Sequence, residues 1–161
     1  MTAPELRPPK GFKDRAELLD FLLEVASLSA STLDLDQLLA RIVALIRSVV
    51  PADLVAILLY SERRRGLRLR YAEGYGAHMD REWLIPLEEG LTGLAAQQRM
   101  PVVCGDVRND PRYLPVLDAI SSEMAIPMTL RGKLVGVIDI QSTRLNAFSS
   151  EDSALVQMIA A

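Results

Sequence analysis

Apolar residues recur along this chain with a helical period near both ends and with a strand period between them. Over residues 16–29 the apolar positions fall on one helical face, with the acidic residues largely off that face. A second amphipathic helix is predicted from Asp34, which stands three residues before Gln37 in the spacing of a capping box, and Pro51 follows the end of that helix. We therefore expect two consecutive helices, one covering the core and one free to face a partner chain.

From residue 54 the period changes to that of strands. LVAILLY (54–60) is an apolar run of strand length, and residues 67–74 alternate apolar and polar positions, as in a strand with one solvated face. The turn SERRRG between these segments predicts a hairpin. WLIPL predicts a further short strand, in which Pro86 marks an edge or an end.

Glycine and proline divide the second half of the chain into short elements. EEGLTG leads into a predicted helix, LAAQQR; PVVC predicts a strand, and GDVRNDPRYLP predicts a polar loop. SEMAIPM and KLVGVIDIQS predict a hairpin, because Gly132 in the turn LRGK can take a positive φ. The last sixteen residues predict a helix in which Ser149 and Asp152 form a capping box. The order of elements predicts an α+β domain with an antiparallel sheet.

Length and composition limit the classes of protein to which the chain can belong. Its 161 residues, 50 % hydrophobic and 24 % charged, suit one globular domain, and we expect a flexible lead-in over residues 1–15 and a single domain over residues 16–161. The net charge of −3 argues against a general nucleic-acid binder. One cysteine and one histidine predict no internal disulfide, no metal and no cofactor. Without a long apolar run, we expect no membrane insertion and a cytoplasmic location.

Arginines gather around the first predicted hairpin, at Arg63, Arg64, Arg65, Arg68 and Arg70. Two interpretations are open: a solvated turn with its outer strand face, or a site for nucleic acid or phosphate. The acidic balance of the whole chain favours the solvated turn.

Three segments in order resemble the GAF domain, a small-molecule sensory module of signalling proteins: LDQLLARIVALI, GLTGLAAQQRMPVVCGDVRNDPRY and LRGKLVGVIDIQS…AFSSEDSALVQMIA. The resemblance covers roughly residues 18–161. It implies a PAS-like architecture with a central antiparallel sheet of about six strands, terminal helices on one face, and pocket-forming loops and short helices on the other. The last predicted helix reaches Ala161 with no Gly, Asn or basic residue to close it, so we expect it to be truncated there and to continue toward a fused output domain.

The resemblance implies a ligand pocket between the sheet and residues 84–123. A helix beginning near Leu91 or Thr92 would direct free N–H groups and a partial positive charge into that region. The candidate ligand-binding residues are Thr92, Gly93, Cys104, Asp106, Asn109, Arg112, Tyr113, Ser122 and Glu123. For each of them a structural role is the alternative. Asp106 and Asn109 are favoured turn formers, Tyr113 can be a packed aromatic of the lid, and Cys104 a small buried side chain.

Departures from better-known relatives narrow the choice of ligand. Phe148 and Asp152 match the pattern of cyclic-nucleotide-binding GAF domains, but Gln141 and Ser142 stand where those relatives carry Asn-Lys, so this ligand is an alternative. Cys104 is not followed by histidine, which argues against a covalent bilin. Free methionine sulfoxide reductases share the fold but exchange disulfides among several cysteines, and one thiol cannot form an internal disulfide.

We therefore predict a regulatory sensor module that binds an unidentified small molecule and signals through its terminal helices to a fused output domain. The N-terminal position resembles that in bacterial metal-dependent serine/threonine phosphatases, with histidine kinases and diguanylate cyclases as alternatives. A second hypothesis is a ligand-free dimerisation module, and a homodimer is expected under both; its predicted interface residues are Leu19, Leu22, Val25, Leu155, Met158 and Ile159. A third hypothesis, an enzyme acting alone, lacks a nucleophile–histidine–acid set, and Asp106 and Asp110 suit turn chemistry. We predict that the domain is not itself an enzyme.

Overall fold

The first described element is the amphipathic helix α2 (Leu35–Val49), whose buried side chains Leu39, Val43 and Ile46 recur at the predicted three- and four-residue steps. The computed structural model describes residues 35–74, 83–114 and 119–160. The chain forms two compact units, residues 1–50 and 51–161, and α2 belongs to the first. The predicted helix over residues 16–29 and the capping role of Asp34 lie outside the described residues.

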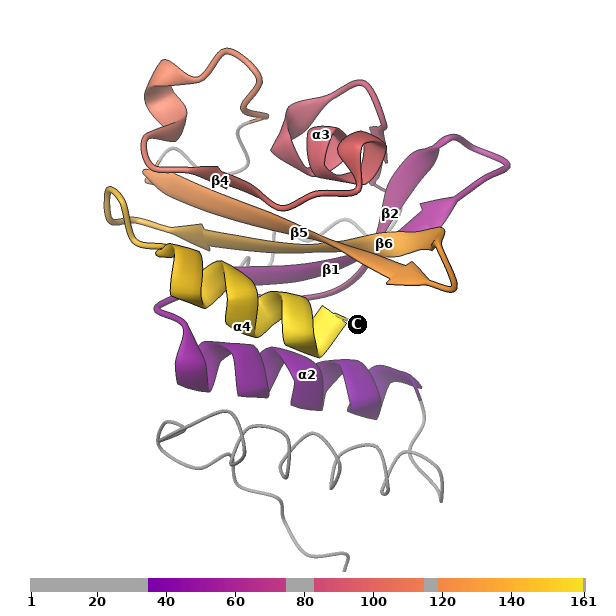
Figure 1. Ribbon diagram of the computed structural model, residues 1–161, viewed down its shortest axis with the longest axis horizontal. Helices are drawn as coiled ribbons and strands as arrows, with labels where there is room; N and C mark the ends of the chain where they lie inside the picture. The colour runs from indigo at the N-terminus through magenta and orange to yellow at the C-terminus, as the bar shows by residue number, and fades with distance from the viewer. Residues whose placement is uncertain (1–34, 75–82, 115–118, 161) are drawn as a thin grey trace, which may run out of the picture. The chain divides into compact units, whose positions relative to one another are not determined.

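The second unit is built on a six-stranded antiparallel sheet in the order β3-β2-β1-β6-β5-β4 (Figure 1). Its strands are β1 (Leu54–Ser61), β2 (Gly66–Glu73), β3 (Leu84–Pro86), β4 (Val102–Cys104), β5 (Ser122–Leu130) and β6 (Lys133–Ser142). Two hairpins, β1–β2 and β5–β6, supply the four central strands, and β1 pairs with β6 to join them. Pro86, which has no backbone N–H, is the last residue of the edge strand β3, a position where the sheet does not need that donor. The predicted α+β sheet is confirmed.

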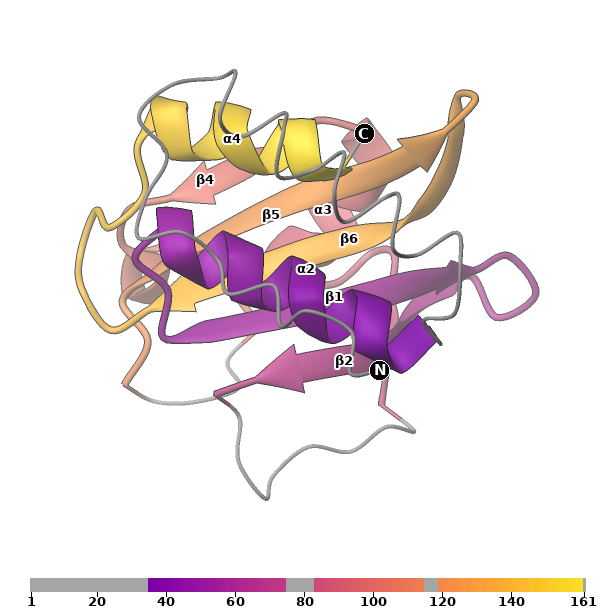
Figure 2. The same ribbon diagram turned by 90° about the horizontal axis from the view of Figure 1, so that it is seen from below.

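Helices cover both faces of this sheet. Helix α3 (Gly90–Gln98), with the short 3-10 helix η2 (Val107–Asn109), lies on one face, and α4 (Ser150–Ala160) lies on the other (Figures 1 and 2). The predicted capping box begins α4: Ser149 Oγ accepts from the Asp152 N–H at 3.1 Å, and Asp152 Oδ2 accepts from the Ser149 N–H at 2.9 Å. No helix in the described ranges is long and apolar enough to cross a membrane.

Strand alternation places the main apolar core between the sheet and α3. Leu54, Ala56 and Leu58 of β1 point to this face and pack in one cluster with Leu91 and Ala95 of α3. The same period carries Val55 and Ile57 to the opposite face, where they are also buried. Because both faces of β1 are covered, the strand is apolar without interruption, as its sequence predicted.

Candidate functional site

Four polar side chains lie on the sheet face that α3 covers, on three neighbouring strands. Cys104 of β4 is paired with Glu123 of β5, and Glu123 with Gln141 of β6. Asp139 lies two residues before Gln141 and is paired with Ala125, which packs in the core beneath α3. Because paired residues and alternate residues of a strand point to the same face, these side chains form one group. We call Cys104, Glu123, Asp139 and Gln141 the polar row.

The two carboxyl groups of the polar row are buried almost completely. Glu123 is 3 % exposed and Asp139 5 % exposed. Burial raises the pKa of Glu123 well above its usual value, and the neighbouring carboxyl of Asp139 raises it further. Burial also raises the pKa of Asp139, while hydrogen bonds from Glu123 and Gln141 act against that shift. These shifts favour the protonated form of Glu123 beside the Asp139 carboxyl.

Two oxygens of the polar row are buried without a hydrogen-bond partner among the described residues. Gln141 Nε2 donates to Asp139 Oδ2 at 2.8 Å, which leaves Asp139 Oδ1 and Gln141 Oε1 unsatisfied. Both atoms are acceptors, and Gln141 is only 1 % exposed. A buried acceptor without a donor is costly, so this arrangement suits a ligand that brings N–H groups. A cationic donor fits best because it also offsets the adjacent acidic charge.

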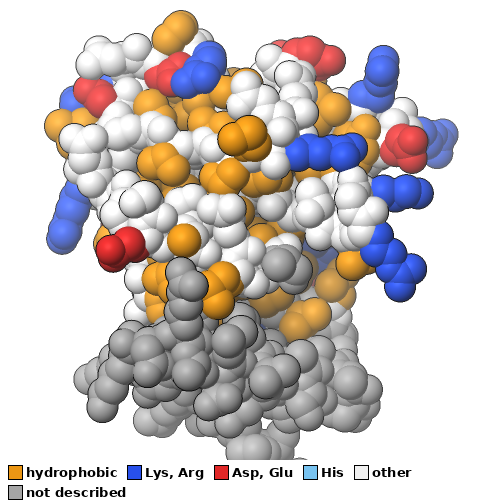
Figure 3. Space-filling view, in the orientation of Figure 1, with side chains coloured by type: hydrophobic (Ala, Val, Ile, Leu, Met, Phe, Trp, Pro, Cys, Tyr) orange, Lys and Arg blue, Asp and Glu red, His pale blue; other side chains and the backbone are white. Residues whose placement is uncertain are grey.

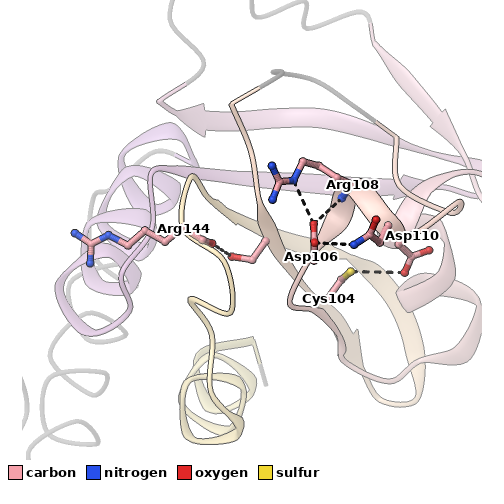
Figure 4. A network of polar contacts seen from close by, with 7 residues as sticks. Cys104, Asp106, Arg108, Asp110 and Arg144 are labelled. Carbon is pink, nitrogen blue, oxygen red and sulfur yellow. Dashed lines mark hydrogen bonds and ion pairs between the residues drawn. The ribbon is translucent and has the colours of Figure 1, made fainter.

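Cys104 links the polar row to the loop after β4. Its thiol donates to Asp110 Oδ2 at 3.6 Å (Figure 4). Asp110 Oδ2 also accepts from the Arg112 guanidinium at 2.7 Å. The Arg112 guanidinium holds the pKa of Asp110 well below its usual range. Burial, and then the Asp110 carboxylate, raise the pKa of the Cys104 thiol. The thiol is therefore protonated in the free protein at neutral pH.

Asp106 and Asn109 hold the shape of this loop. Asp106 caps η2 by accepting from the Arg108 N–H at 3.2 Å, and it also accepts from Asn109 Nδ2 at 2.8 Å (Figure 4). Their polar groups thus bind each other within the loop, which matches the turn-forming alternative.

Three further predicted residues lie in packed surroundings. Thr92 is buried in α3, and a Cβ at Gly93 would stand 2.5 Å from the Leu87 carbonyl oxygen. Ser122 and Glu123 both lie within β5, as the predicted strand SEMAIPM places them, and successive residues of a strand point to opposite faces. Ser122 Oγ donates to the Arg144 carbonyl oxygen at 2.6 Å (Figure 4). The structure therefore does not bring Ser122 to the polar row.

A cleft of about 340 Å³ lies between α3 and residues 111–114. It brings together the predicted residues Arg112 and Tyr113, and it also contains the start of α3 at Gly90, one residue before the predicted start. The other lining residues are Leu87, Glu88, Glu89, Leu94, Gln97, Pro111 and Leu114. The loop that carries Asp110 continues directly into this wall, so the cleft and the polar row share one loop.

Sequence reasoning missed Asp139 and Gln141 as site residues. A signal was present, because VIDIQ places two polar residues at alternate positions of an otherwise apolar strand. Such a pattern predicts a polar stripe on one buried face, which is unusual without a ligand or partner.

A family model described as the GAF domain matches residues 32–161. The chain belongs to the GAF domain family. It is also similar to GAF domain-containing protein A of Dictyostelium discoideum, with 30 % identity over 70 residues. That alignment covers 44 % of this chain and 44 % of that protein, so the match spans less than half of either one.

Solved structures of enzymes and of regulatory domains resemble this GAF domain. The free methionine-R-sulfoxide reductase of Neisseria meningitidis, solved with its substrate, is 24 % identical with a TM-score of 0.79, over 96 % of this chain and 90 % of that one. The corresponding type II enzyme of Thermoplasma acidophilum is 28 % identical with a TM-score of 0.63, over 89 % and 90 %. The GAF domain of an Acinetobacter phosphoenolpyruvate-protein phosphotransferase is 23 % identical with a TM-score of 0.77, over 89 % and 88 %.

These similarities correct one prediction. The expectation that this domain is not an enzyme is wrong, because free methionine-R-sulfoxide reductases recur among the structures that match it. The expectation rested on the lack of a nucleophile–histidine–acid set, and the argument against a reductase rested on the count of one cysteine within the chain. That count excludes an internal disulfide only, since a sulfenic acid can also be reduced by a thiol from another molecule.

Proposed function

We propose that this GAF domain binds a small molecule carrying an ammonium group, and that the polar row is the recognition site. The observation that carries the proposal is the pair of buried, unpartnered oxygens, Asp139 Oδ1 and Gln141 Oε1, beside the buried Glu123 carboxyl, whose pKa is raised. An ammonium group offers three N–H donors and a positive charge. It would satisfy both oxygens and allow Glu123 to ionise.

The similar structures support the same class of ligand. The Neisseria structure contains the substrate of that enzyme. The enzyme is named for free methionine sulfoxide, an amino acid with an ammonium group. An anionic ligand would instead add negative charge to a row that already holds two buried carboxyls. We therefore place free amino acids and related amines ahead of cyclic nucleotides.

GAF domains are in general small-ligand sensory or regulatory modules, and we propose this role here. Asp139 and Gln141 lie on β6, and the chain runs from β6 through residues 143–149 into α4 on the opposite face. A ligand that prefers one position of β6 would shift the packing of α4 by its differential affinity. We propose that α4 passes this shift to a fused output domain, of which a serine/threonine phosphatase is the first candidate from the resemblance.

Calorimetry with matched ligands tests the proposal. Methionine and methionine sulfoxide, as free amino acids, are compared with analogues in which hydrogen replaces the amino group. We expect the protein to bind the amino acids only. Asp139→Asn should weaken this binding about tenfold to a hundredfold, because a charge-assisted hydrogen bond is lost. Asp106→Asn, which keeps an N-cap in the loop, is the control and should leave the affinity unchanged. Equal binding of both sets would contradict recognition of the ammonium group.

Reduction of a sulfoxide is a second candidate function, favoured by the position of Cys104 beside the proton-carrying Glu123. The Cys104 thiol would take the oxygen of a sulfoxide, giving a sulfide and a cysteine sulfenic acid. An external thiol would then form a mixed disulfide with release of water, and a second external thiol would restore Cys104. One sulfoxide and two thiols thus yield one sulfide, one disulfide and one water.

Product formation separates this candidate from simple binding. With methionine sulfoxide and excess dithiothreitol, chromatography should detect free methionine in amounts above the protein concentration. Cys104→Ser should stop turnover while ligand binding persists, and the rate should rise with pH because the thiol pKa is raised. Turnover by Cys104→Ser, or its absence in the native protein, would reject the candidate and leave the binding proposal standing.

A further inference from the structure

Three arginines of the second unit adopt a left-handed backbone conformation that glycine or asparagine adopts at lower cost. Arg65 in the β1–β2 turn has φ 50°, Arg99 at the C-cap of α3 has φ 54°, and Arg131 in the β5–β6 turn has φ 51°. The only other such non-glycine position in the described ranges is Asn146, where the residue type is the usual one. Turn geometry therefore does not account for arginine at these three positions.

All three arginines lie at the same end of the sheet. β1 pairs with β6 through Leu59 and Gly136, so the turn that ends β1 and the turn that begins β6 are neighbours, as Figures 1 and 2 show. Arg99 joins them because its Nη1 donates to the Gly132 carbonyl oxygen at 2.6 Å. Figure 3 shows Lys and Arg gathered along this edge. We call this set the basic end: Arg63, Arg64, Arg65, Arg99, Arg131 and Lys133.

Among the described residues, the cations of the basic end outnumber the acidic side chains near it. The ion pairs Arg108–Asp106 and Arg112–Asp110 lie outside this set. Two acidic residues of the described ranges lie nearby. Glu62 is in the first turn. Glu88 follows Leu87, and the Leu87 N–H donates to the Arg65 carbonyl oxygen at 3.4 Å. Cations thus outnumber acids here, although the chain as a whole carries −3.

Large apolar side chains stand beside these cations. Leu130, adjacent to Arg131, is 66 % exposed, and Met100, adjacent to Arg99, is 62 % exposed. They are the most exposed of the large apolar residues in the described ranges. A projecting hairpin turn that combines cations with exposed aliphatic side chains suits a surface that is anionic outside and apolar just beneath.

We propose that the basic end docks this domain on an anionic lipid surface, with the arginines on lipid phosphates and carboxylates and with Leu130 and Met100 at the headgroup boundary. Arginine binds such oxygens in pairs, and each cation near the surface adds to the attraction. A single-stranded nucleic acid would be favoured by stacking aromatics, and residues 62–65 and 130–133 contain none. The site is separate from the polar row, so the inference stands whether or not the proposed ligand is found.

Vesicle sedimentation with the full chain tests the inference. Phosphatidylcholine vesicles with about 30 mol % phosphatidylserine are compared with pure phosphatidylcholine. We expect binding to the anionic vesicles only, and loss of binding at about 0.5 M salt. Arg65→Asn with Arg131→Asn should weaken binding about twenty-fivefold, since each cation contributes about fivefold. Asparagine tolerates the left-handed conformation, so the variant should keep its fold.

A matched pair of substitutions and a competing set of polyanions complete the design. Arg108→Asn with Arg144→Asn removes the same charge elsewhere and should change vesicle binding less than about threefold. Leu130→Ser should weaken binding to vesicles but not to polyglutamate or duplex DNA. Equal losses in the two double variants would overturn the proposal, as would absence of binding to anionic vesicles. Binding to polyglutamate or DNA but not to vesicles would also overturn it, in favour of another anionic partner.

Discussion

Glu123 lies in β5 with a carboxyl that both burial and the neighbouring Asp139 hold in the protonated form. In the unfolded chain this carboxyl titrates near 4.5, whereas in the folded domain its pKa is well above that value. At a pH between these two pKa values, the folded state holds a proton that the unfolded state has lost. The stabilising contribution of Glu123 is complete below pH 4.5 and disappears as the pH rises through the folded pKa.

The substitution Glu123→Gln tests this linkage, because the amide keeps the shape of the protonated carboxyl but does not titrate. Relative to the native protein, the free energy of unfolding of the variant should rise by on the order of 1 kcal/mol between pH 5 and pH 8. Urea denaturation at both pH values measures the change. Glu151→Gln, at an exposed position in the first turn of α4, is the control and should show little pH-dependent difference. A difference independent of pH for Glu123→Gln would contradict the raised pKa.

At the same scale, the sequence predicted part of the candidate site. Glu123 and Cys104 could be proposed because they lie in residues 84–123, where the resemblance implies the pocket. Asp139 and Gln141 could not, because their nearness to Glu123 depends on the register of β5 with β6, which no local pattern specifies. Ser122 lies apart from the polar row because a shift of one residue along a strand changes the face of the sheet.

The strand hairpins were the elements best predicted from the sequence. Their apolar runs, the turn residues and Gly132 agree locally, and each hairpin forms within a short stretch of chain. The loop over residues 105–114 was the least well predicted. Its shape depends on specific side-chain bonds, such as those from Asp106 and Asp110, and not on periodicity.

Gly93 shows that a residue proposed to bind ligand can instead be required for packing. It lies inside α3, where replacement of glycine by alanine ordinarily stabilises a helix by about 1 kcal/mol. Here the new Cβ would stand 2.5 Å from the Leu87 carbonyl oxygen and 3.2 Å from that of Pro86. Helix α3 thus approaches the backbone after β3 too closely for a side chain.

We therefore expect Gly93→Ala to destabilise the domain by about 1 to 3 kcal/mol, the range for overpacked sites. Chemical denaturation measures this value, with Gln98→Ala at an exposed position of the same helix as the control. The sign decides between the two effects. If Gly93→Ala is stabilising, helix propensity dominates and α3 does not need the close approach.

The whole molecule places different chemistry on different sides of one sheet. The polar row lies beneath α3, the basic end gathers at two neighbouring turns, and α4 covers the face opposite to α3. Because β6 begins at the basic end and later carries Asp139 and Gln141, one strand connects both proposed sites. Binding at one site can affect the other through a shift of β6, or of β5, which carries Glu123 and ends at Leu130, and calorimetry with vesicles present would measure this coupling.

The predicted homodimer is also a property of the whole molecule, and α4 allows it to be tested. Leu155, Met158 and Ile159 are only partly buried in the described structure, and Leu19, Leu22 and Val25 lie outside the described residues. If the face containing Leu155 and Ile159 meets a second copy, Leu155→Glu with Ile159→Glu would bury two charges in an apolar contact and weaken the dimer at least a hundredfold.

Light scattering after size exclusion should then give the dimer mass for the native chain and the monomer mass for this variant. Ala154→Glu with Gln157→Glu adds the same charge on the exposed side of α4 and should leave the dimer intact. Circular dichroism must show equal helicity in both variants, because an unfolded chain would also lose the dimer. A native chain that stays monomeric at high concentration would refute the homodimer. Dissociation by both variants would show instead that charge alone, and not this face of α4, controls association.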